Sequence, residues 1–287
     1  MFHQISKDGY SAAISSLGAE LKSFKDGTGE EYIWSGDPDV WKGAAPILFP
    51  IVGELRDGRY SHNGKSYRLT RHGFSRTSVF SHGALGESES SFVLTSNAET
   101  RLAYPFDFEL EVTFRIERAR LCVSYRVVNK GNGAMPFKLG SHPAFSLPVD
   151  DCGLESYWIE FEKAETLDLY HLVDGLVSPD PKKSFLQNEK TIRITPTLFD
   201  NDALIFKNIK SREIHIQRDG AGRRLTLDTG GAPHLGIWAK PAAPYVCLEP
   251  WHGHADGVGE DFDIMKKSGV TILRPGGEFT TGYDIRL

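Results

Sequence analysis

The sequence predicts an all-β protein in which antiparallel sheets stack on one another. Many short segments alternate apolar and polar residues, and glycine, asparagine, aspartate and proline separate them. The alternation is clearest between residues 108 and 116, where every second side chain is apolar. Side chains of a strand point alternately to its two faces, so each such strand has one buried and one wetter face. That pattern is typical of stacked antiparallel sheets, and helix should be scarce.

The composition is that of an ordered globular protein. The 287 residues are 40% hydrophobic and 11% aromatic, which is enough for a full core and argues against disorder. The formal net charge is -5 and the pI is near 6.1, which argues against nucleic acid or an anionic membrane as a partner. We find no internal repeat and no linker, so we predict a single domain over residues 1–287.

The expected location is the cytoplasm. The first residues lack the apolar core of a signal peptide, and no run is long and apolar enough to span a bilayer. The chain has three cysteines, Cys122, Cys152 and Cys247. Because this number is odd and no CxxC pair occurs, reduced thiols are expected. Cys247 is close to the site described below, but no base beside it in sequence marks it as a nucleophile.

The first third of the chain combines short strands with one unusual loop. Strands are expected over residues 10–15 and 19–24, and one helical turn over residues 38–41 opens the loop. Residues 43–53 are apolar but contain Pro46 and Pro50, which exclude a regular helix or a central strand. We expect such a proline-stiffened apolar loop to line or seal another part of the structure. Residues 59–62 and 65–69 then form a hairpin, because Asn63-Gly64 between alternating runs favours a type I′ turn.

The rest of the chain reads as a meander followed by weaker strands. Strands cover residues 108–116, 121–127 and 135–139; the alternation then fails at Gly140-Ser141, and Pro143 ends the strand just after His142. Further strands are expected at residues 157–161, 203–206, 213–217, 225–228 and 235–238. A short helix is expected at residues 261–267. A final hairpin joins residues 270–273 to 278–285 over Pro275-Gly276-Gly277.

Residues 245–251 contain the first candidate functional group. Val246 and Leu248 share one strand face and Cys247 and Glu249 the other, and Pro250 should end the strand near Glu249. A carboxylate at a strand end beside an indole suits a sugar, since the carboxylate takes hydroxyl protons and the ring stacks on C–H groups. The competing interpretation is an edge-strand glutamate that makes an ordinary surface contact.

Two histidines form a possible constellation with this glutamate. His72 and His142 each stand in a turn or at a strand end, and a large sandwich can bring such ends to one cleft. A glutamate and a histidine facing each other across a hydroxylated ring form an acid–base pair. The competing interpretation for each histidine is an ordinary, half-buried structural residue. No phosphate-binding loop, dinucleotide fingerprint or GxSxG elbow is present.

A metal site is the alternative that the histidines leave open. His252 and His254 form an HxH pair, and a metal there needs further ligands, which His72, His142 or Glu249 could supply. An HxH pair alone is weak evidence, so we predict no metal.

Taken in order, these stretches resemble the aldose 1-epimerase (galactose mutarotase-like) superfamily, in particular its bacterial LacX-like subgroup. The residues that carry the resemblance are 46–53 (PILFPIVG), 71–76 (RHGFSR), 139–145 (LGSHPAF), 236–238 (GIW) and 247–251 (CLEPW). The resemblance implies a β-supersandwich with few short helices. It also implies an isomerase that interconverts the α and β anomers of a free aldose without metal or organic cofactor.

The resemblance also implies roles for individual residues. His142 is expected to protonate the ring oxygen and Glu249 to take the proton of the C1 hydroxyl, with the Glu249 carboxylate raising the pKa of His142. His72 is expected to hold the sugar, with Arg56 as the binding arginine and Asp202 as the binding aspartate. Trp251 is a candidate sugar-binding residue and stacking platform, with Trp238 as the alternative; the competing interpretation is that either is a core residue. A small-molecule sugar is the expected partner, with no nucleic acid and no membrane, and the protein is expected to be a monomer or homodimer.

Departures from the family pattern leave the substrate open. Residues 53–57 (GELRD) replace the usual Asn-Arg motif, and His72-Gly73-Phe74 replaces His-Gly-Gly. The His-Gly-Phe form also resembles the hexose-6-phosphate epimerase branch, in which several arginines bind phosphate; here these would be Arg56, Arg59, Arg71 and Arg76. The alternatives are therefore a hexose-6-phosphate 1-epimerase, a non-catalytic sugar-binding protein on the same fold and, third, a metal-dependent β-sandwich enzyme.

Overall fold

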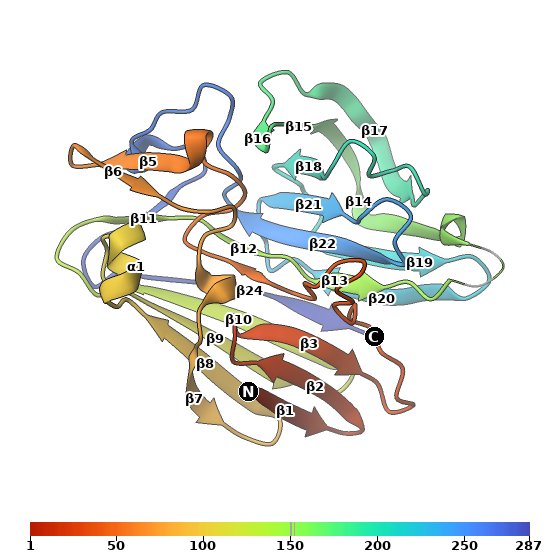
Figure 1. Ribbon diagram of the computed structural model, residues 1–287. Coiled ribbons are helices and arrows are strands. Elements are labelled where there is room, and N and C mark those ends of the chain that lie inside the picture. The colour runs from red at the N-terminus through yellow and green to blue at the C-terminus, as the bar shows by residue number, and fades with distance from the viewer. Residues whose placement is uncertain (150, 152) are drawn as a thin grey trace.

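In the computed structural model, antiparallel strands dominate the chain, which confirms the all-β prediction (Figure 1). The structure describes residues 1–149, 151 and 153–287, so Cys152 lies outside the described residues. Within that part of the chain the one α-helix is α1 (Ala98–Ala103), and none of the helices could cross a lipid bilayer. The other helical segments are the 3-10 turns η1 (Arg56–Gly58), η2 (Ser75–Thr77), η3 (Leu154–Ser156) and η4 (Ile264–Lys266).

The largest sheet has nine strands and supplies most of the core. Its inward side chains follow the alternation read from the sequence: the apolar positions of residues 108–116 are all buried, and those between them are more exposed. In spatial order its strands are β17 (Lys182–Arg193), β14 (Tyr157–Leu169), β19 (Glu213–Arg218), β20 (Gly222–Asp228), β24 (Glu278–Arg286), β10 (Arg120–Asn129), β9 (Phe108–Ile116), β8 (Glu89–Thr95) and β7 (Ser81–Leu85).

A second sheet packs on the first and carries the candidate site. Its strands are β18 (Leu204–Lys207), β21 (His234–Trp238), β22 (Tyr245–His252), β12 (Leu139–Ser141) and β4 (Ile47–Leu48), with β13 (Ala144–Ser146) also paired to β22. Val246 and Leu248 face the main core. Ser141 Oγ donates to Tyr125 Oη of β10 at 2.9 Å, which joins the two sheets. The opposite face of the second sheet, with Glu249 on it, points away from the nine-stranded sheet.

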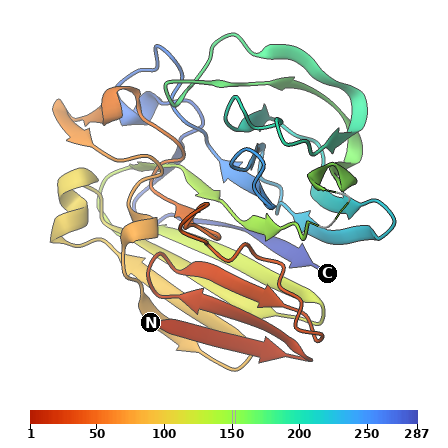
Figure 2. The same ribbon diagram turned by 45° about the vertical axis from the view of Figure 1, so that its right-hand side comes forward.

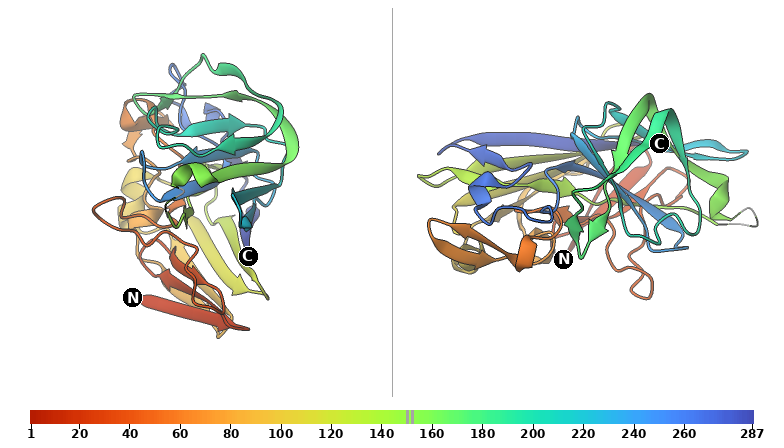
Figure 3. Two further views of the ribbon diagram at one scale, coloured as in Figure 1. Left: turned by 90° about the vertical axis from the view of Figure 1, so that its right-hand side faces the viewer. Right: turned by 90° about the horizontal axis from the view of Figure 1, so that it is seen from above.

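Smaller units complete the molecule. The N-terminal sheet, β1 (Phe2–Lys7), β2 (Tyr10–Ser15) and β3 (Glu20–Lys25), packs against β9 and lies at one end of the molecule (Figure 3). The long strands β14 and β17 curve past the second sheet, where β14 contacts β18 (Figure 2). The remaining pairs are β5 (Arg59–His62) with β6 (Lys65–Arg68), β11 (Met135–Phe137) with β23 (Thr271–Leu273), and β15 (Leu172–Val173) with β16 (Leu176–Val177).

Several local expectations can be compared directly with the structure. The hairpin around Asn63-Gly64 is confirmed, and both residues have the positive φ that a type I′ turn requires. The prediction of a final hairpin is wrong, because β23 pairs with β11 whereas β24 lies between β20 and β10. Tyr283 and Ile285 at the end of β24 are buried in the core, which places this strand in the large sheet. The helix at residues 261–267 is only the single turn η4, and residues 38–40 form a turn rather than a helix.

Candidate active site

Glu249 lies within β22, opposite a break in the neighbouring strand. β12 and β13 pair with β22 on either side of this break and keep one continuous register. His142, in the break, is therefore directly across from Glu249, and opposed residues of antiparallel strands point to the same face. His142 Nε2 lies 3.3 Å from Glu249 Oε1. Both side chains are buried, and the Glu249 residue is only 2% exposed.

The expectation that β22 ends at Pro250 is wrong. The strand continues to His252, and Pro250 pairs with Leu235 of β21. On its other side the register places Pro250 across from Ser141, at the end of β12, where no ladder pair forms. A proline without an N–H group therefore costs this sheet little. Pro143, in contrast, does interrupt its strand, as expected, and the interruption frees His142 from regular pairing.

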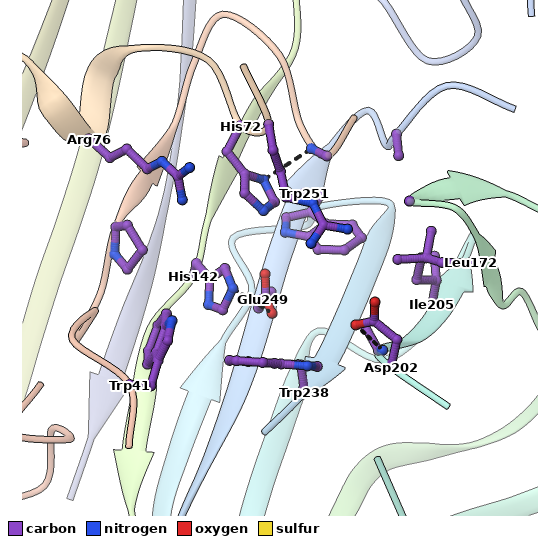
Figure 4. Close-up of a pocket in the computed structure, with 16 residues that line it drawn as sticks. Trp41, His72, Arg76, His142, Leu172, Asp202, Ile205, Trp238, Glu249 and Trp251 are labelled. Carbon is purple, nitrogen blue, oxygen red and sulfur yellow. Dashed lines mark hydrogen bonds and ion pairs between the residues drawn. The ribbon is translucent and has the colours of Figure 1, made fainter. Parts of the chain in front are cut away.

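His142 and Glu249 line a pocket with a cavity volume of about 170 Å³. Figure 4 shows His142 and Glu249 between Trp41, Trp238, His72 and Asp202. Five of the six candidate site residues line this pocket, and only Arg56 does not. The full lining is Trp41, Pro46, Gly53, Arg71, His72, Arg76, His142, Leu172, Gly175, Asp202, Ala203, Ile205, Trp238, Glu249, Trp251 and Ala255.

His72 is oriented by a reciprocal contact with Gly53. The Gly53 N–H donates to His72 Nδ1 at 3.0 Å, and the His72 backbone N–H donates to the Gly53 carbonyl at 2.9 Å. Burial, reinforced by His142 and two arginines, holds the pKa of His72 well below its usual range. A neutral ring that accepts at Nδ1 carries its proton on Nε2, which leaves an Nε2–H donor for a ligand.

Backbone geometry explains the glycines that flank His72. His72 itself has φ +67°, an uncommon conformation for a non-glycine residue. A Cβ on Gly73 would lie 2.6 Å from the Phe49 carbonyl carbon, and one on Gly53 would lie 2.9 Å from Ala255 Cα. Glycine at both positions lets the 46–53 loop and the 71–76 turn approach closely enough for the His72 contact.

Two further glycines make room for the Trp251 indole. Gly140 lies opposite Trp251 on β12, and Gly236 lies opposite Glu249 on β21. A Cβ on Gly140 would lie 2.7 Å from Trp251 Cδ1, and one on Gly236 would lie 2.6 Å from Cη2. The indole therefore lies across three strands beside Glu249, where bulkier neighbours would displace it.

Aromatic rings also enclose His142. Trp41 stacks on its imidazole with ring centroids 5.0 Å apart, and Trp238 meets it edge-on at 5.7 Å. The two tryptophans come from different parts of the chain, a loop after β3 and the end of β21. They remove His142 from water and fix its ring plane, so the imidazole faces Glu249.

Burial sets the protonation of the central pair. It raises the pKa of Glu249 well above its usual range and lowers the pKa of His142 to about 3. Burial therefore disfavours the charged form of both groups. The expected increase in the pKa of His142 is wrong, because burial, reinforced by Arg76 and Arg71, lowers that pKa.

The pocket arginines are Arg71 and Arg76 rather than Arg56. The Arg56 guanidinium lies over the Phe262 ring, 3.7 Å from its centroid, away from the pocket. Arg71 Nε lies 3.4 Å from Glu54 Oε1. Arg76 is half-buried and forms no ion pair within the described residues. Burial followed by the nearby Arg71 lowers its pKa, and the more distant Glu54 and Glu20 oppose that effect. The pocket thus presents an unneutralised cation beside His72, as Figure 4 shows.

Asp202 lies at the opposite side of the pocket from Arg76 (Figure 4). It has φ +72° and its Oδ1 accepts the Ala203 N–H at 2.8 Å, which leaves Oδ2 for a ligand. Its charge is one of the smaller causes of the raised Glu249 pKa. A second acceptor is therefore available at the pocket mouth.

His252 and His254, which form the HxH pair, are not among the residues that line this pocket. His252 Nε2 contacts Thr281 Oγ1 at 2.7 Å, and His254 Nδ1 donates to the Ala255 carbonyl at 2.8 Å. Among the described residues, one group of potential metal ligands comes together instead, formed by His142, Cys247 and Glu249.

Comparison with known proteins is consistent with this geometry. A family model for aldose 1-epimerase matches residues 1–281. The chain belongs to the aldose 1-epimerase family. It is 32% identical to the chromosomal protein LacX of Lactococcus lactis over 284 residues, which covers 96% of this chain and 95% of LacX.

Solved structures of the family superpose closely on this chain. A galactose mutarotase related enzyme from Lactobacillus acidophilus has a TM-score of 0.94 and 34% identity, covering 100% of this chain and 97% of its own. A galactose mutarotase-like protein from Lactobacillus casei has a TM-score of 0.94 and 29% identity, covering 100% and 99%. These matches confirm the galactose mutarotase-like fold and the LacX-like resemblance read from the motifs.

Proposed function

We propose that this aldose 1-epimerase family member interconverts the α and β anomers of a hexose through His142 and Glu249. The observation that carries the proposal is their direct opposition, 3.3 Å apart, on the floor of the pocket. The two oxygens that exchange protons during anomer exchange are both bonded to C1 of the sugar. An acid and a base that serve them must therefore lie close together, as these side chains do.

The reaction requires only proton transfers. Glu249 takes the proton of the C1 hydroxyl while His142 gives one to the ring oxygen, and the bond between C1 and that oxygen breaks. The C1–C2 bond of the open-chain aldehyde rotates, and closure on the other face reverses both transfers. The net proton count of the enzyme is unchanged, so no cofactor has to supply or remove charge.

Burial disfavours the charged form of both members of this pair. A sugar hydroxyl that donates to the Glu249 carboxylate replaces part of its lost hydration, which favours an ionised Glu249 and a protonated His142. Trp41 and Trp238 hold the imidazole in place during proton transfer. Substrate contact therefore favours the charged acid and base that the reaction requires.

Other pocket residues would hold the ring. The His72 Nε2–H donates to a hydroxyl, and Asp202 Oδ2 accepts from another. Trp251 and Trp238, which line the pocket, offer apolar ring surface to the C–H groups of the sugar. Recognition of a neutral hexose through such polar groups and ring faces is the expected use of a mostly preformed pocket.

Arg76 favours a second candidate, a hexose that carries an anionic group such as phosphate. An unneutralised, half-buried guanidinium beside a second arginine is costly unless an anion arrives to pair with it. The pair Arg71 and Arg76 lies next to His72, so a phosphate there would still leave C1 free to reach His142 and Glu249. The chemistry at C1 is the same for both substrates.

Polarimetry of freshly dissolved α-D-glucose, α-D-galactose and glucose 6-phosphate tests the proposal. Faster decay of rotation with purified protein, lost in Glu249→Gln, supports the epimerase, and the sugar with the larger kcat/KM identifies the substrate class. Sugar binding by calorimetry without any acceleration would instead support a non-catalytic sugar-binding protein and would overturn the proposal.

A further inference from the structure

Cys247 is a group beside the catalytic pair for which the proton-transfer mechanism has no use. It is fully buried, two residues before Glu249 on the same face of β22. Burial, with the Glu249 charge as a second cause, raises the pKa of its thiol well above the usual range, so it is not a nucleophile at neutral pH. A cysteine with no acid–base role here still offers a soft metal ligand.

Three donor atoms of different types converge at this point. A ring nitrogen of His142, Cys247 Sγ and a Glu249 carboxylate oxygen all lie within 4.8 Å of one another. In a tetrahedral zinc site, bond lengths of about 2.0 to 2.3 Å place ligand atoms about 3 to 4 Å apart. The histidine–glutamate separation already has that value at 3.3 Å, so modest rotation of the Cys247 side chain completes the arrangement.

The buried Glu249 carboxyl has few partners. Its Oε2 makes no hydrogen bond of regular geometry within the described part of the chain, and the Trp251 side chain is the nearby group that favours its charged form. A divalent cation bound by a thiolate, a carboxylate and a neutral imidazole gives a locally neutral centre, which is the arrangement that a desolvated site tolerates. The donors are held by two paired strands, so little ordering is required on binding.

We propose that His142, Cys247 and Glu249 form a binding site for a thiophilic divalent cation such as Zn²⁺, open to the pocket for a fourth ligand. Binding forms three coordination bonds, and the thiol proton passes to solvent together with any proton that Glu249 carries. A bound cation engages both members of the catalytic pair. If the proposed epimerase reaction holds, the metal-loaded protein is therefore inactive, and zinc acts as a reversible inhibitor rather than a cofactor.

Direct metal binding tests the site without reference to activity. Protein stripped with EDTA is dialysed against Zn²⁺ and its metal content measured; Co²⁺ is used in parallel, because a thiolate ligand gives cobalt a charge-transfer absorption band. Cys247→Ser should lower the affinity by at least about tenfold and remove that band, since even changes behind metal ligands cost ten- to a hundredfold. Cys122→Ser is the matched control, because Cys122 is half-buried on the nine-stranded sheet, away from the pocket.

Activity then tests the inhibition separately. Zn²⁺ should abolish anomer exchange by the wild type and by Cys122→Ser, EDTA should restore it, and Cys247→Ser should keep its basal rate but resist zinc. Equal zinc binding by the wild type and Cys247→Ser, or no cobalt–thiolate band, would overturn the site. A protein that binds zinc through Cys247 but turns over no sugar would leave the site standing and refute only the epimerase.

Discussion

His142 and Glu249 lie directly across from each other on neighbouring strands, at the one place where the ladder between those strands is interrupted. Pro143 prevents regular pairing there, while β12 and β13 on either side keep a common register. The pair is therefore positioned by the sheet itself rather than by flexible loops. A site on paired strands holds reacting groups more closely than one built on loops.

Replacement of either member should abolish anomer exchange. Glu249→Gln and His142→Asn each remove one half of the acid–base pair, and we expect rates to fall by about a hundred- to ten-thousand-fold. His72→Asn should mainly raise KM, because in the proposed mechanism its Nε2–H holds the sugar and transfers no proton. Polarimetry measures all three, with Cys122→Ser as a control. A near-normal rate for Glu249→Gln would exclude this glutamate as the base.

Glu249→Gln should also change how stability depends on pH. The folded pKa of Glu249 is raised, so its contribution to the free energy of unfolding is fully present below the unfolded value near 4.5 and is lost as pH rises toward the folded pKa. The glutamine cannot ionise. The melting temperature of the variant, relative to wild type, should therefore increase as pH is raised above about 4.5. A difference that is constant with pH would contradict the raised pKa.

Much of this site was predictable from sequence, because strand periodicity is a local signal. The faces of residues 245–249, the strand end before Pro143 and the I′ hairpin all follow from alternation and turn residues. Asp202 was found through the family resemblance, and His72 through its place in a turn, with its role given by the resemblance. Their approach to Glu249 depends on loops that meet only in the folded chain.

Other features could not be read from the sequence. Arg56 and Arg76 are both arginines in polar turns, and only tertiary packing sends one to Phe262 and the other to the pocket. Trp41 carried no signal of its contact with His142. The edge strand β17 was missed because its exposed, charge-rich sequence has little alternation. The glycines under Trp251 could have been recognised, since Gly140 and Gly236 interrupt strands that are otherwise regular.

The two arginine positions give a matched pair of variants. Arg76→Gln should raise KM for a phosphorylated hexose by about tenfold or more, since hydrogen bonds to charged groups contribute about 1.5 to 3 kcal/mol. Arg56→Gln removes a guanidinium that lies on Phe262, so KM should stay close to the wild-type value. Steady-state kinetics with glucose and glucose 6-phosphate measure both. An equal change in KM in the two variants would show that the location of Arg76 in the pocket does not determine binding of the phosphorylated hexose.

Gly236→Ala should disturb sugar binding without touching the sugar. The new methyl group would lie 2.6 Å from Trp251 Cη2, so the indole must move, and overpacking of this kind costs about 1 to 3 kcal/mol of stability. We expect a higher KM and a lower melting temperature. Gly133→Ala is the control, because nothing lies within 4 Å of its added Cβ. An unchanged KM in a folded Gly236→Ala protein would remove Trp251 from the binding surface.

A buried ion cluster should dominate the stability of the loop that carries Ala255. Lys267 Nζ lies 2.5 Å from Asp256 Oδ2, both side chains are almost fully buried, and Asp256 Oδ2 also accepts the Arg56 N–H at 3.0 Å. Lys267→Met leaves a buried carboxylate with only the more distant Lys138, whose Nζ is 3.6 Å from Asp256 Oδ1. We expect the free energy of unfolding, measured with urea, to fall by about 3 kcal/mol or more. Removing one partner of a buried ion pair leaves the other as an uncompensated charge in the interior.

The neighbouring Lys266 supplies the control for that measurement. Its side chain is 67% exposed and lies 3.7 Å from Asp263, so Lys266→Met should change the free energy of unfolding by less than about 1 kcal/mol. The cluster joins the loop before η1 to the loop after β22, and through Gly53 the first of these loops holds His72. Lys267→Met should therefore also raise KM in the protein that remains folded. Equal stabilities of the two variants would show that the buried cluster does not hold these loops together.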